Sequence, residues 1–421
     1  MKKRPGYFVT APHERAAGDQ CAKCGACTAV CPVYQVTGRE SLTARGRLHL
    51  LNRLANPASP VYGKIVSACL LCGACLDVCP RKIDTLTPLI RAREQLPLSA
   101  RYRFLEKFVA RKTLASPRLL DGLASLRQKL LHHLPKTSGL WLKLALLPED
   151  YAPDEAPPAL PASQPGGVPP VVSYFSGCLA RYLSPDIGAA TDFLTRRVTG
   201  SPLLIPGEQT CCGLASFAGG SREEARDLAR KNIAAFAGHG LPILTSCASC
   251  YSHLRSYPAL LADDPRWRSH AEDFAGRVRE FSRFFLEAGL APPAGPLTLE
   301  QGDAAGIFYH DPCHLRFGPE KIMAQPRRLL AKIMGAPPVE LAGGPHCCGQ
   351  GGLFHLAHPQ LSQQILALPM AQLLELSASH VVTTCSGCLL QWQQGLRQTE
   401  FSGRVCHLAV LLAGIIRQKG G

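Results

Sequence analysis

The sequence predicts a small α-helical domain followed by two copies of an α/β domain. Three observations support this order. Two four-cysteine runs flank a helical pattern in the first 98 residues, a proline-rich stretch follows, and beyond it three cysteine motifs recur at offsets of 135, 136 and 138 residues. The 421 residues, 46% of them hydrophobic, are enough for several cores and exclude a disordered chain.

The first domain, predicted at 1–98, contains the two cysteine runs. Each has the spacing C-x2-C-x2-C-x3-C-P, with Cys21, Cys24, Cys27 and Cys31 in the first run and Cys69, Cys72, Cys75 and Cys79 in the second. In such pairs, three thiolates hold one [4Fe-4S] cluster and the fourth serves the other cluster. Zinc is the alternative, but it needs only two short ligand pairs.

The exchange of fourth ligands defines two predicted sites. The first cluster site comprises Cys21, Cys24, Cys27 and Cys79, and the second cluster site comprises Cys69, Cys72, Cys75 and Cys31. Two such clusters with eight thiolates carry roughly four negative charges when oxidised. Arg45, Arg47, Arg81 and Lys82 are candidates to compensate them, or else they are ordinary surface charges.

Basic charge is concentrated in the first 150 residues, which hold 24 Lys and Arg against 10 Asp and Glu. No nucleic-acid-binding motif accompanies it, so we expect an acidic partner or an anionic membrane surface. Residues 99–151 read as a basic amphipathic helical segment, and 152–170, with seven prolines in nineteen positions, as a linker. The segment either docks the chain or braces the domains that follow.

The two α/β domains are predicted at 171–295 and 304–418, with each cysteine motif at the end of a β-like run. The first CCG site, named for its Cys-Cys-Gly motif, comprises Cys178, Cys211, Cys212, Cys247 and Cys250; the second CCG site comprises Cys313, Cys347, Cys348, Cys385 and Cys388. Five thiols exceed the needs of zinc or a cubane cluster, which favours an iron–sulfur or thiol-redox site over zinc or buried structural thiols. His310, His314 and His346 adjoin these cysteines as candidate proton carriers or structural residues.

The cysteine motifs of all three predicted domains resemble those of known protein families. The first domain resembles the α-helical ferredoxin module, and the two repeats resemble the cysteine-rich CCG domain of glycolate oxidase, anaerobic glycerol-3-phosphate dehydrogenase and heterodisulfide reductase. With ARGRLHLL after the first run and YHDPCHLRFG opening the second repeat, the chain looks most like the glycolate oxidase iron–sulfur subunit. The resemblance implies two [4Fe-4S] clusters and one or two further non-cubane iron–sulfur clusters at the CCG sites.

The resemblance also implies a function. The chain would take electrons from a separate FAD-dependent subunit that oxidises glycolate to glyoxylate, or D-lactate to pyruvate, and pass them towards membrane quinone. The alternatives are a heterodisulfide-reductase-like subunit that uses a CCG cluster in catalysis and a non-enzymatic regulator. No flavin, nucleotide or c-type haem motif is present, so we expect the substrate chemistry on another chain and name no catalytic residue here.

The location of the chain is a further expectation. We find no signal peptide after Lys3 and Arg4, and the longest apolar run, from Leu408 to Ile416, is about half a membrane span. We therefore expect a cytoplasmic protein, in peripheral contact with the inner face of the membrane at most.

Overall fold

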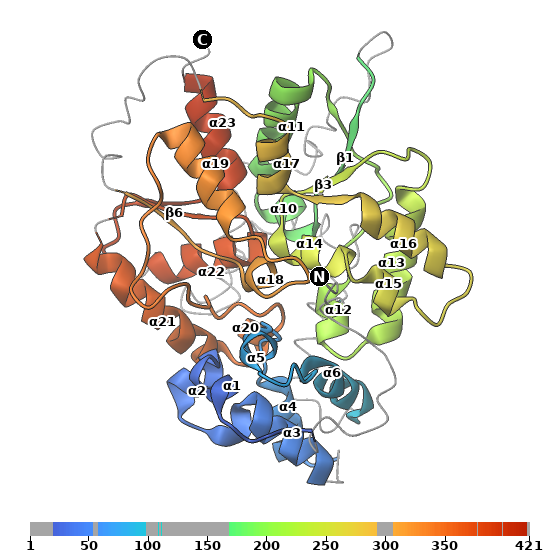
Figure 1. Cartoon of the computed structure of the whole chain (residues 1–421), viewed down its shortest axis with the longest axis vertical. Helices are drawn as coiled ribbons and strands as arrows, with labels where there is room; N and C mark the ends of the chain where they lie inside the picture. The colour runs from blue at the N-terminus through green and yellow to red at the C-terminus, as the bar shows by residue number, and fades with distance from the viewer. Residues whose placement is uncertain are drawn as a thin grey trace, which may run out of the picture.

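The computed structural model describes residues 20–53, 58–97, 108, 111, 168–292 and 306–418, apart from 377, 398 and the side chains of 52 and 53. A helical domain lies at one end of the molecule, and two α/β domains lie side by side beyond it (Figure 1). Of the predicted basic segment and linker, only 108, 111 and 168–170 fall within the described residues.

The helical domain consists of short helices that turn around the two cysteine runs. They are α1 (Ala26–Ala29), α2 (Pro32–Thr37), η1 (Glu40–Leu42), α3 (Ala44–Arg53), α4 (Pro60–Ser67), α5 (Ala74–Val78) and α6 (Leu86–Gln95). Gly25 and Gly73 precede α1 and α5 with φ angles of 84° and 83°. Glycine adopts this left-handed conformation without strain, so the backbone can turn sharply between the second and third cysteine of each run.

The first α/β domain is a parallel sheet with helices around it. Its elements are β1 (Val172–Phe175), α10 (Cys178–Leu183), α11 (Asp186–Thr199), β2 (Leu203–Leu204), α12 (Leu214–Ala218), α13 (Arg222–Ala235), β3 (Ile243–Thr245), α14 (Ala248–Leu254), α15 (Tyr257–Leu260), α16 (Arg268–Arg277), β4 (Val278–Glu280) and α17 (Phe281–Glu287). The strand order is β2-β1-β3-β4, and all four residues of β1 are buried. Strands buried on both faces are typical of parallel α/β sheets.

The second α/β domain has the same arrangement with one strand fewer among its described residues. Its elements are β5 (Ile307–Tyr309), α18 (Cys313–Arg316), α19 (Ala324–Met334), α20 (Phe354–Ala357), α21 (Pro359–Glu375), β6 (His380–Thr383), α22 (Ser386–Leu396), β7 (Arg404–His407) and α23 (Leu408–Gln418). The parallel sheet has the order β5-β6-β7. A single bridge between Phe308 and Val339 lies where β2 pairs in the first domain.

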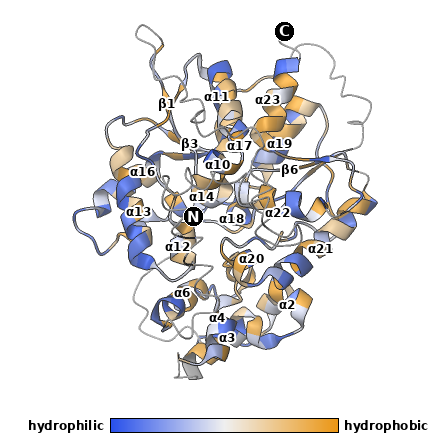
Figure 2. Ribbon diagram, turned by 180° about the vertical axis from the view of Figure 1, so that it is seen from behind, coloured by the Kyte–Doolittle hydropathy of each residue, from blue (hydrophilic) through white to orange (hydrophobic). Residues whose placement is uncertain are grey.

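Four helices join the two α/β domains. Helix α11 packs against α23, and α17 packs against α19. In each pair, one helix follows β1 or β5 near the start of its domain, and the other follows β7 or β4, the last strand of the other domain. Leu194, Phe285, Leu329 and Leu412 are fully buried in this seam. Helix α23 is correspondingly hydrophobic, whereas α13 on the outside is mostly hydrophilic (Figure 2).

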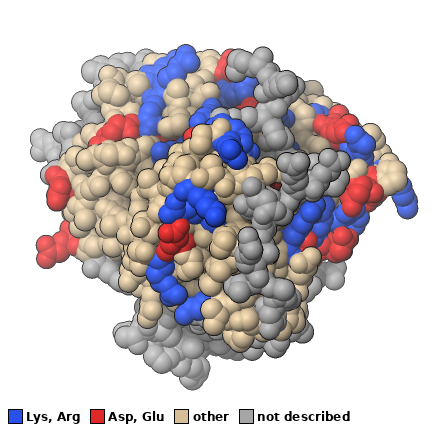
Figure 3. Space-filling model, turned by 60° about the horizontal axis from the view of Figure 1, so that its bottom comes forward, with Lys and Arg blue, Asp and Glu red and all other residues tan. Residues whose placement is uncertain are grey.

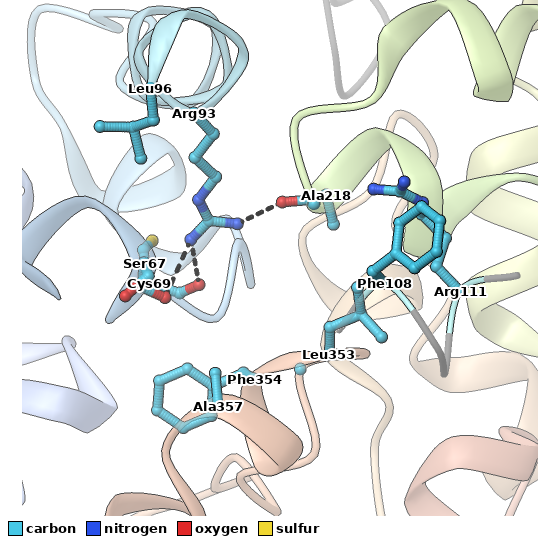
Figure 4. Close-up of a pocket in the computed structure, with 12 residues that line it drawn as sticks. Ser67, Cys69, Arg93, Leu96, Phe108, Arg111, Ala218, Leu353, Phe354 and Ala357 are labelled. Carbon is cyan, nitrogen blue, oxygen red and sulfur yellow. Dashed lines mark hydrogen bonds between the residues drawn. The ribbon is translucent and has the colours of Figure 1, made fainter. Parts of the chain in front are cut away.

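The helical domain docks on both α/β domains. Arg93 of α6 is buried and donates to the carbonyl oxygens of Cys69 (2.7 Å) and Ala218 (2.6 Å), thereby connecting a cysteine run to α12 (Figure 4). Ser67 bonds His358 of the second α/β domain at 2.9 Å. Because these contacts are buried, they hold the cysteine runs in a fixed position against the CCG domains.

Surface features of the described residues bear on the docking predictions. None of the helices described is long and apolar enough to cross a bilayer. Lys and Arg form separate groups on the face shown in Figure 3, with no continuous basic patch among its described residues. Arg111, one of the basic residues of the predicted amphipathic segment, is buried in an ion pair with Glu224 of α13.

Candidate functional site: four adjoining cysteine sites

The first cluster site surrounds one cavity. Cys21, Cys24, Cys27 and Cys79 all line it, together with Arg45 and Arg81. Arg45 donates to the Lys23 carbonyl oxygen at 2.9 Å, and Arg81 donates to the Gln20 carbonyl oxygen at 2.8 Å. Both guanidinium groups are therefore fixed beside the thiols, where positive charge compensates an anionic group.

The second cluster site lies directly beside the first. Cys31, Cys69, Cys72 and Cys75 line its cavity, and Ala44, Cys75 and Thr85 line both cavities. Arg47 also lines the second cavity, is 4% exposed and donates to the Ile65 carbonyl oxygen at 3.2 Å. Lys82, the remaining predicted cation, lines neither cavity and donates to the Asp77 carbonyl oxygen at 2.9 Å.

The pKa values of two thiols in the second cluster site indicate what binding a metal there involves. Burial raises the pKa of Cys72, and the neighbouring Cys347 thiol raises it further. Burial likewise raises the pKa of Cys75, and the Cys72 thiol adds to this shift. The metal-free site therefore keeps protons on these sulfurs at neutral pH. A metal that binds thiolates displaces the protons and removes this repulsion.

The first CCG site brings together five thiols from three loops. Cys178 begins α10, Cys211 and Cys212 precede α12, Cys247 caps α14, and Cys250 lies within α14. The Cys178 and Cys211 sulfurs are 3.6 Å apart, and hydrogen bonds link Cys211 to Cys212 and Cys212 to Cys250. A side chain at Gly177 would meet the Cys250 sulfur at 3.0 Å, so glycine permits this close approach.

Two buried polar residues hold the Cys211–Cys212 loop. Asn232 of α13 donates to the Cys211 carbonyl oxygen at 3.0 Å, and Tyr257 donates to the Cys212 carbonyl oxygen at 2.8 Å. Both side chains are fully buried and bond to each other. Neither residue follows the cysteine spacing, so the sequence carries no signal for their role.

The second CCG site also brings its five cysteines together, and a histidine joins them. Cys313 begins α18, Cys385 caps α22 and Cys388 lies within α22. Ligand atoms of His310, Cys348 and Cys388 all lie within 4.8 Å of one another, and all three residues are buried. A hydrogen bond with the Cys388 thiol lowers the pKa of Cys348 to about 5. Burial acts in the opposite direction, and His310 acts in the same direction as Cys388. This pKa favours a thiolate at neutral pH.

The other two predicted histidines lie elsewhere. His314 Nδ1 bonds the Ser249 hydroxyl at 2.8 Å, and Ser249 in turn bonds the Cys385 sulfur at 3.2 Å. His346 Nε2 bonds the Ala342 carbonyl oxygen at 3.2 Å. Of the three candidates, His310 is thus the one grouped with a pair of CCG thiols.

The two CCG sites touch each other across the domain seam. A hydrogen bond links Cys247 of the first site to Cys385 of the second, and hydrogen bonds from Cys247 and Cys388 lower the pKa of Cys385 well below its usual range. The Ala248 amide donates to the Thr384 carbonyl oxygen at 2.8 Å. His407, at the end of β7, bonds the Ser246 carbonyl oxygen at 2.8 Å and fixes the same seam.

The second CCG site also adjoins the second cluster site. Cys31, Cys72 and Cys347 pack around one hydrophobic cluster that includes Leu70 and Phe354. Gly351 makes this contact close, since a Cβ atom there would lie 2.5 Å from Leu70 Cδ2. The four cysteine sites therefore form a continuous series through the three domains. The groups that could bind a metal are thiols, which range from buried to exposed, and one imidazole at the second CCG site. Such ligands suit iron in iron–sulfur clusters.

Comparisons with known proteins agree with this site chemistry. Residues 17–83 match the 4Fe-4S dicluster domain, and residues 172–255 and 307–393 match the Cysteine-rich domain, CCG. The structure is thus that of an iron–sulfur protein with a ferredoxin-like domain and two CCG domains.

Two curated relatives define the family. The chain is 32% identical to the probable glycolate oxidase iron-sulfur subunit of Bacillus subtilis, with 93% of this chain and 92% of that protein covered. It is 31% identical to lactate utilization protein A of an Exiguobacterium species, with 59% of this chain and 99% of that protein covered. The chain belongs to the family of the glycolate oxidase iron–sulfur subunit.

Proposed function

We propose that this chain is the iron–sulfur electron-transfer subunit of a 2-hydroxy acid dehydrogenase that oxidises glycolate to glyoxylate or D-lactate to pyruvate. A separate FAD-dependent subunit would remove two electrons and two protons from the hydroxy acid, and this chain would carry the electrons onward, one at a time, towards membrane quinone. The observation that carries the proposal is the continuity of the four cysteine sites. The names of the two relatives supply the substrate class.

We assign the metal ligands as the cysteine spacing predicts. Cys21, Cys24, Cys27 and Cys79 would hold one [4Fe-4S] cluster, and Cys31, Cys69, Cys72 and Cys75 the other. The cavities that these two sets line support the assignment. The thiols of each CCG site would hold one further iron–sulfur group. Bound clusters supply one-electron storage, while Arg45, Arg47 and Arg81 keep positive charge beside them.

Burial favours electron transfer over the heterodisulfide-reductase alternative. Direct reduction of a disulfide requires the substrate sulfurs to reach the metal group or a thiolate. At the seam between the CCG sites, Cys247 is 6% exposed and Cys385 is 2% exposed, whereas Cys178, Cys313 and Cys347 are partly buried. Electron transfer through the chain needs no such access, because electrons cross packed protein between neighbouring centres.

Anaerobic copurification with the flavoprotein tests the proposal. We expect at least about 8 irons per chain, with matching acid-labile sulfide, and bleaching of the visible band when glycolate or D-lactate is added to the complex. The variant C72S should retain the flavoprotein and its reduction by substrate, yet block the reduction of the CCG sites. Stoichiometric zinc without sulfide, or substrate-independent bleaching, would contradict the proposal.

A second experiment separates the alternative function. The isolated chain, reduced chemically, is mixed with a small disulfide and the released thiols are counted. The proposal expects no catalytic turnover, whereas sustained thiol release would favour the heterodisulfide-reductase reading.

A further inference from the structure

The two CCG sites differ at a buried position beside the thiols. The cysteine repeat aligns Cys178 with Cys313 and therefore Phe175 with His310. Phe175 ends β1, is fully buried and packs against the Phe236 ring at 6.2 Å. His310 follows β5, is 2% exposed and lies beside the thiols. One half thus has an apolar ring where the other has an imidazole.

The histidine faces two thiols that arrive from different loops. Cys348 belongs to the Cys-Cys-Gly loop and Cys388 to α22, yet their sulfurs and an imidazole nitrogen of His310 lie within 4.8 Å of one another. Such separations match ligands around one metal atom, since Fe and Zn lie about 2.0 to 2.3 Å from nitrogen and sulfur. Imidazole and thiolate both suit iron.

The backbone and ring of His310 are held in this orientation. Its amide donates to the Val382 carbonyl oxygen at 2.8 Å, and its carbonyl oxygen accepts from the Thr383 hydroxyl at 3.2 Å. The next residue, Asp311, accepts two hydrogen bonds from Arg327, at 2.7 and 2.6 Å. The Trp392 ring packs on the imidazole with centroids 5.5 Å apart. Fixed orientation of this kind is what a metal site requires of its ligands.

We propose that His310, together with Cys348 and Cys388, is a direct ligand of an iron atom in the second CCG site, whereas the first CCG site is held by thiolates alone. The inference rests on the proposed function only in taking the metal group to be iron–sulfur. His310 would take the place of one of the five thiolates as a ligand. A neutral imidazole in place of a thiolate lowers the negative charge of an iron–sulfur centre and raises its reduction potential. The second CCG site is then the more readily reduced of the pair.

The higher reduction potential of the second CCG site affects how electrons move along the four cysteine sites. The second CCG site lies between the second cluster site, through Cys347, and the first CCG site, through Cys385. A centre with the higher potential at this position collects electrons from the ferredoxin-like domain and holds them beside the seam.

Pulsed electron paramagnetic resonance of the holoprotein labelled with 15N-histidine tests the ligand directly. We expect a strongly coupled imidazole nitrogen in the wild-type protein that disappears in H310F, the variant carrying the residue of the first half. The midpoint potential of one centre should also fall. The control H346F changes a histidine that adjoins Cys347 in sequence but bonds a backbone carbonyl oxygen, and it should keep the coupling.

A conservative variant keeps the test valid if H310F folds poorly. H310C restores a soft ligand, so we expect it to retain iron, lose the nitrogen coupling and lower the potential. An absent coupling in the wild type, a coupling that survives H310F, or zinc in place of iron at this site would overturn the proposal. Reduction by the hydroxy acid is measured separately, so failure of the proposed function alone leaves the nitrogen coupling intact.

Discussion

Neighbouring thiols in this protein differ widely in proton affinity. Hydrogen bonds from Cys178 and Cys212 lower the pKa of Cys211, whereas a hydrogen bond to Cys211 raises the pKa of Cys178. One sulfur of such a pair ionises while the other keeps its proton, because two buried negative charges repel. A multivalent metal group removes this conflict, which is a reason to expect one at the first CCG site.

The exchange of fourth ligands gives a sharp residue-level prediction. Cys79 lines the cavity of the first cluster site, so C79S should perturb the centre built on Cys21, Cys24 and Cys27 and leave the other centre intact. Its matched control, C31S, should perturb only the centre built on Cys69, Cys72 and Cys75. Mössbauer and paramagnetic resonance spectra distinguish the two centres. A C79S spectrum that matches that of C69S would refute the exchange.

The sequence predicted the thiols much better than the groups around them. Cysteine spacing carries information because metal ligands recur at fixed intervals within one run. Asn232 and Tyr257, which hold the Cys211–Cys212 loop, lie on separate helices and carry no such signature. His310 was visible as a neighbour of Cys313, but its contact with Cys348 and Cys388 depends on the folding of three separate segments.

At the scale of elements, the loop after Cys348 positions the helical domain. Gly351 has a φ of 49°, and a Cβ atom there would lie 2.5 Å from Leu70 Cδ2 and 2.9 Å from Phe354 Cβ. Gly352 has a similar φ of 60°, but a Cβ atom there would meet nothing within 4 Å. Substitution at Gly352 therefore tests backbone strain alone, whereas substitution at Gly351 tests the same strain together with steric contact between domains.

The substitution G351A should weaken the contact between the second cluster site and the second CCG site. Both G351A and G352A cost about 1 kcal/mol for a left-handed alanine, but G351A also pushes Leu70 and the Cys69–Cys72 backbone away. We expect slower reduction of the CCG sites in G351A than in G352A, measured by stopped-flow spectroscopy. Equal rates in the two variants would show that this contact does not limit electron transfer.

The elements themselves follow from sequence patterns more closely than their pairing does. Apolar runs before Cys178 and Cys313 form β1 and β5, as predicted for strands that end at a site. The isolated bridge at Val339, where the first domain has β2, is too short to leave a periodic signal. The packing of α11 on α23 and of α17 on α19 is reciprocal between the two domains, and hydrophobic patterns alone do not specify which helices meet.

For the whole molecule, the order of the sites in space is the property that sequence did not predict. Cys347 lies near Cys31 and Cys72, and Cys247 near Cys385, through contacts between separate domains. Local spacing contains no information about such contacts. Arg93 shows how the order is fixed, because one buried side chain bonds the backbone of Cys69 and of Ala218. The relation of the basic segment 99–151 to this assembly stays a prediction.

Metal removal should affect the three domains unequally. Helix α1 has no buried residue and α5 buries only Ala74, so these two helices, unlike the packed residues Val33 and Leu70 of the same domain, depend on bound metal for their order. The seam between α11 and α23 is held instead by fully buried residues such as Leu194 and Leu412. After anaerobic chelation of iron, we expect amide exchange to rise at least about tenfold in 24–30 and 73–79 and to change little in α11 and α23. Hydrogen-exchange mass spectrometry measures both regions in one sample. A uniform rise across the chain would mean that the metal sites stabilise the α/β domains as much as the helical one, and unchanged exchange near the cysteine runs would mean that packing alone orders them.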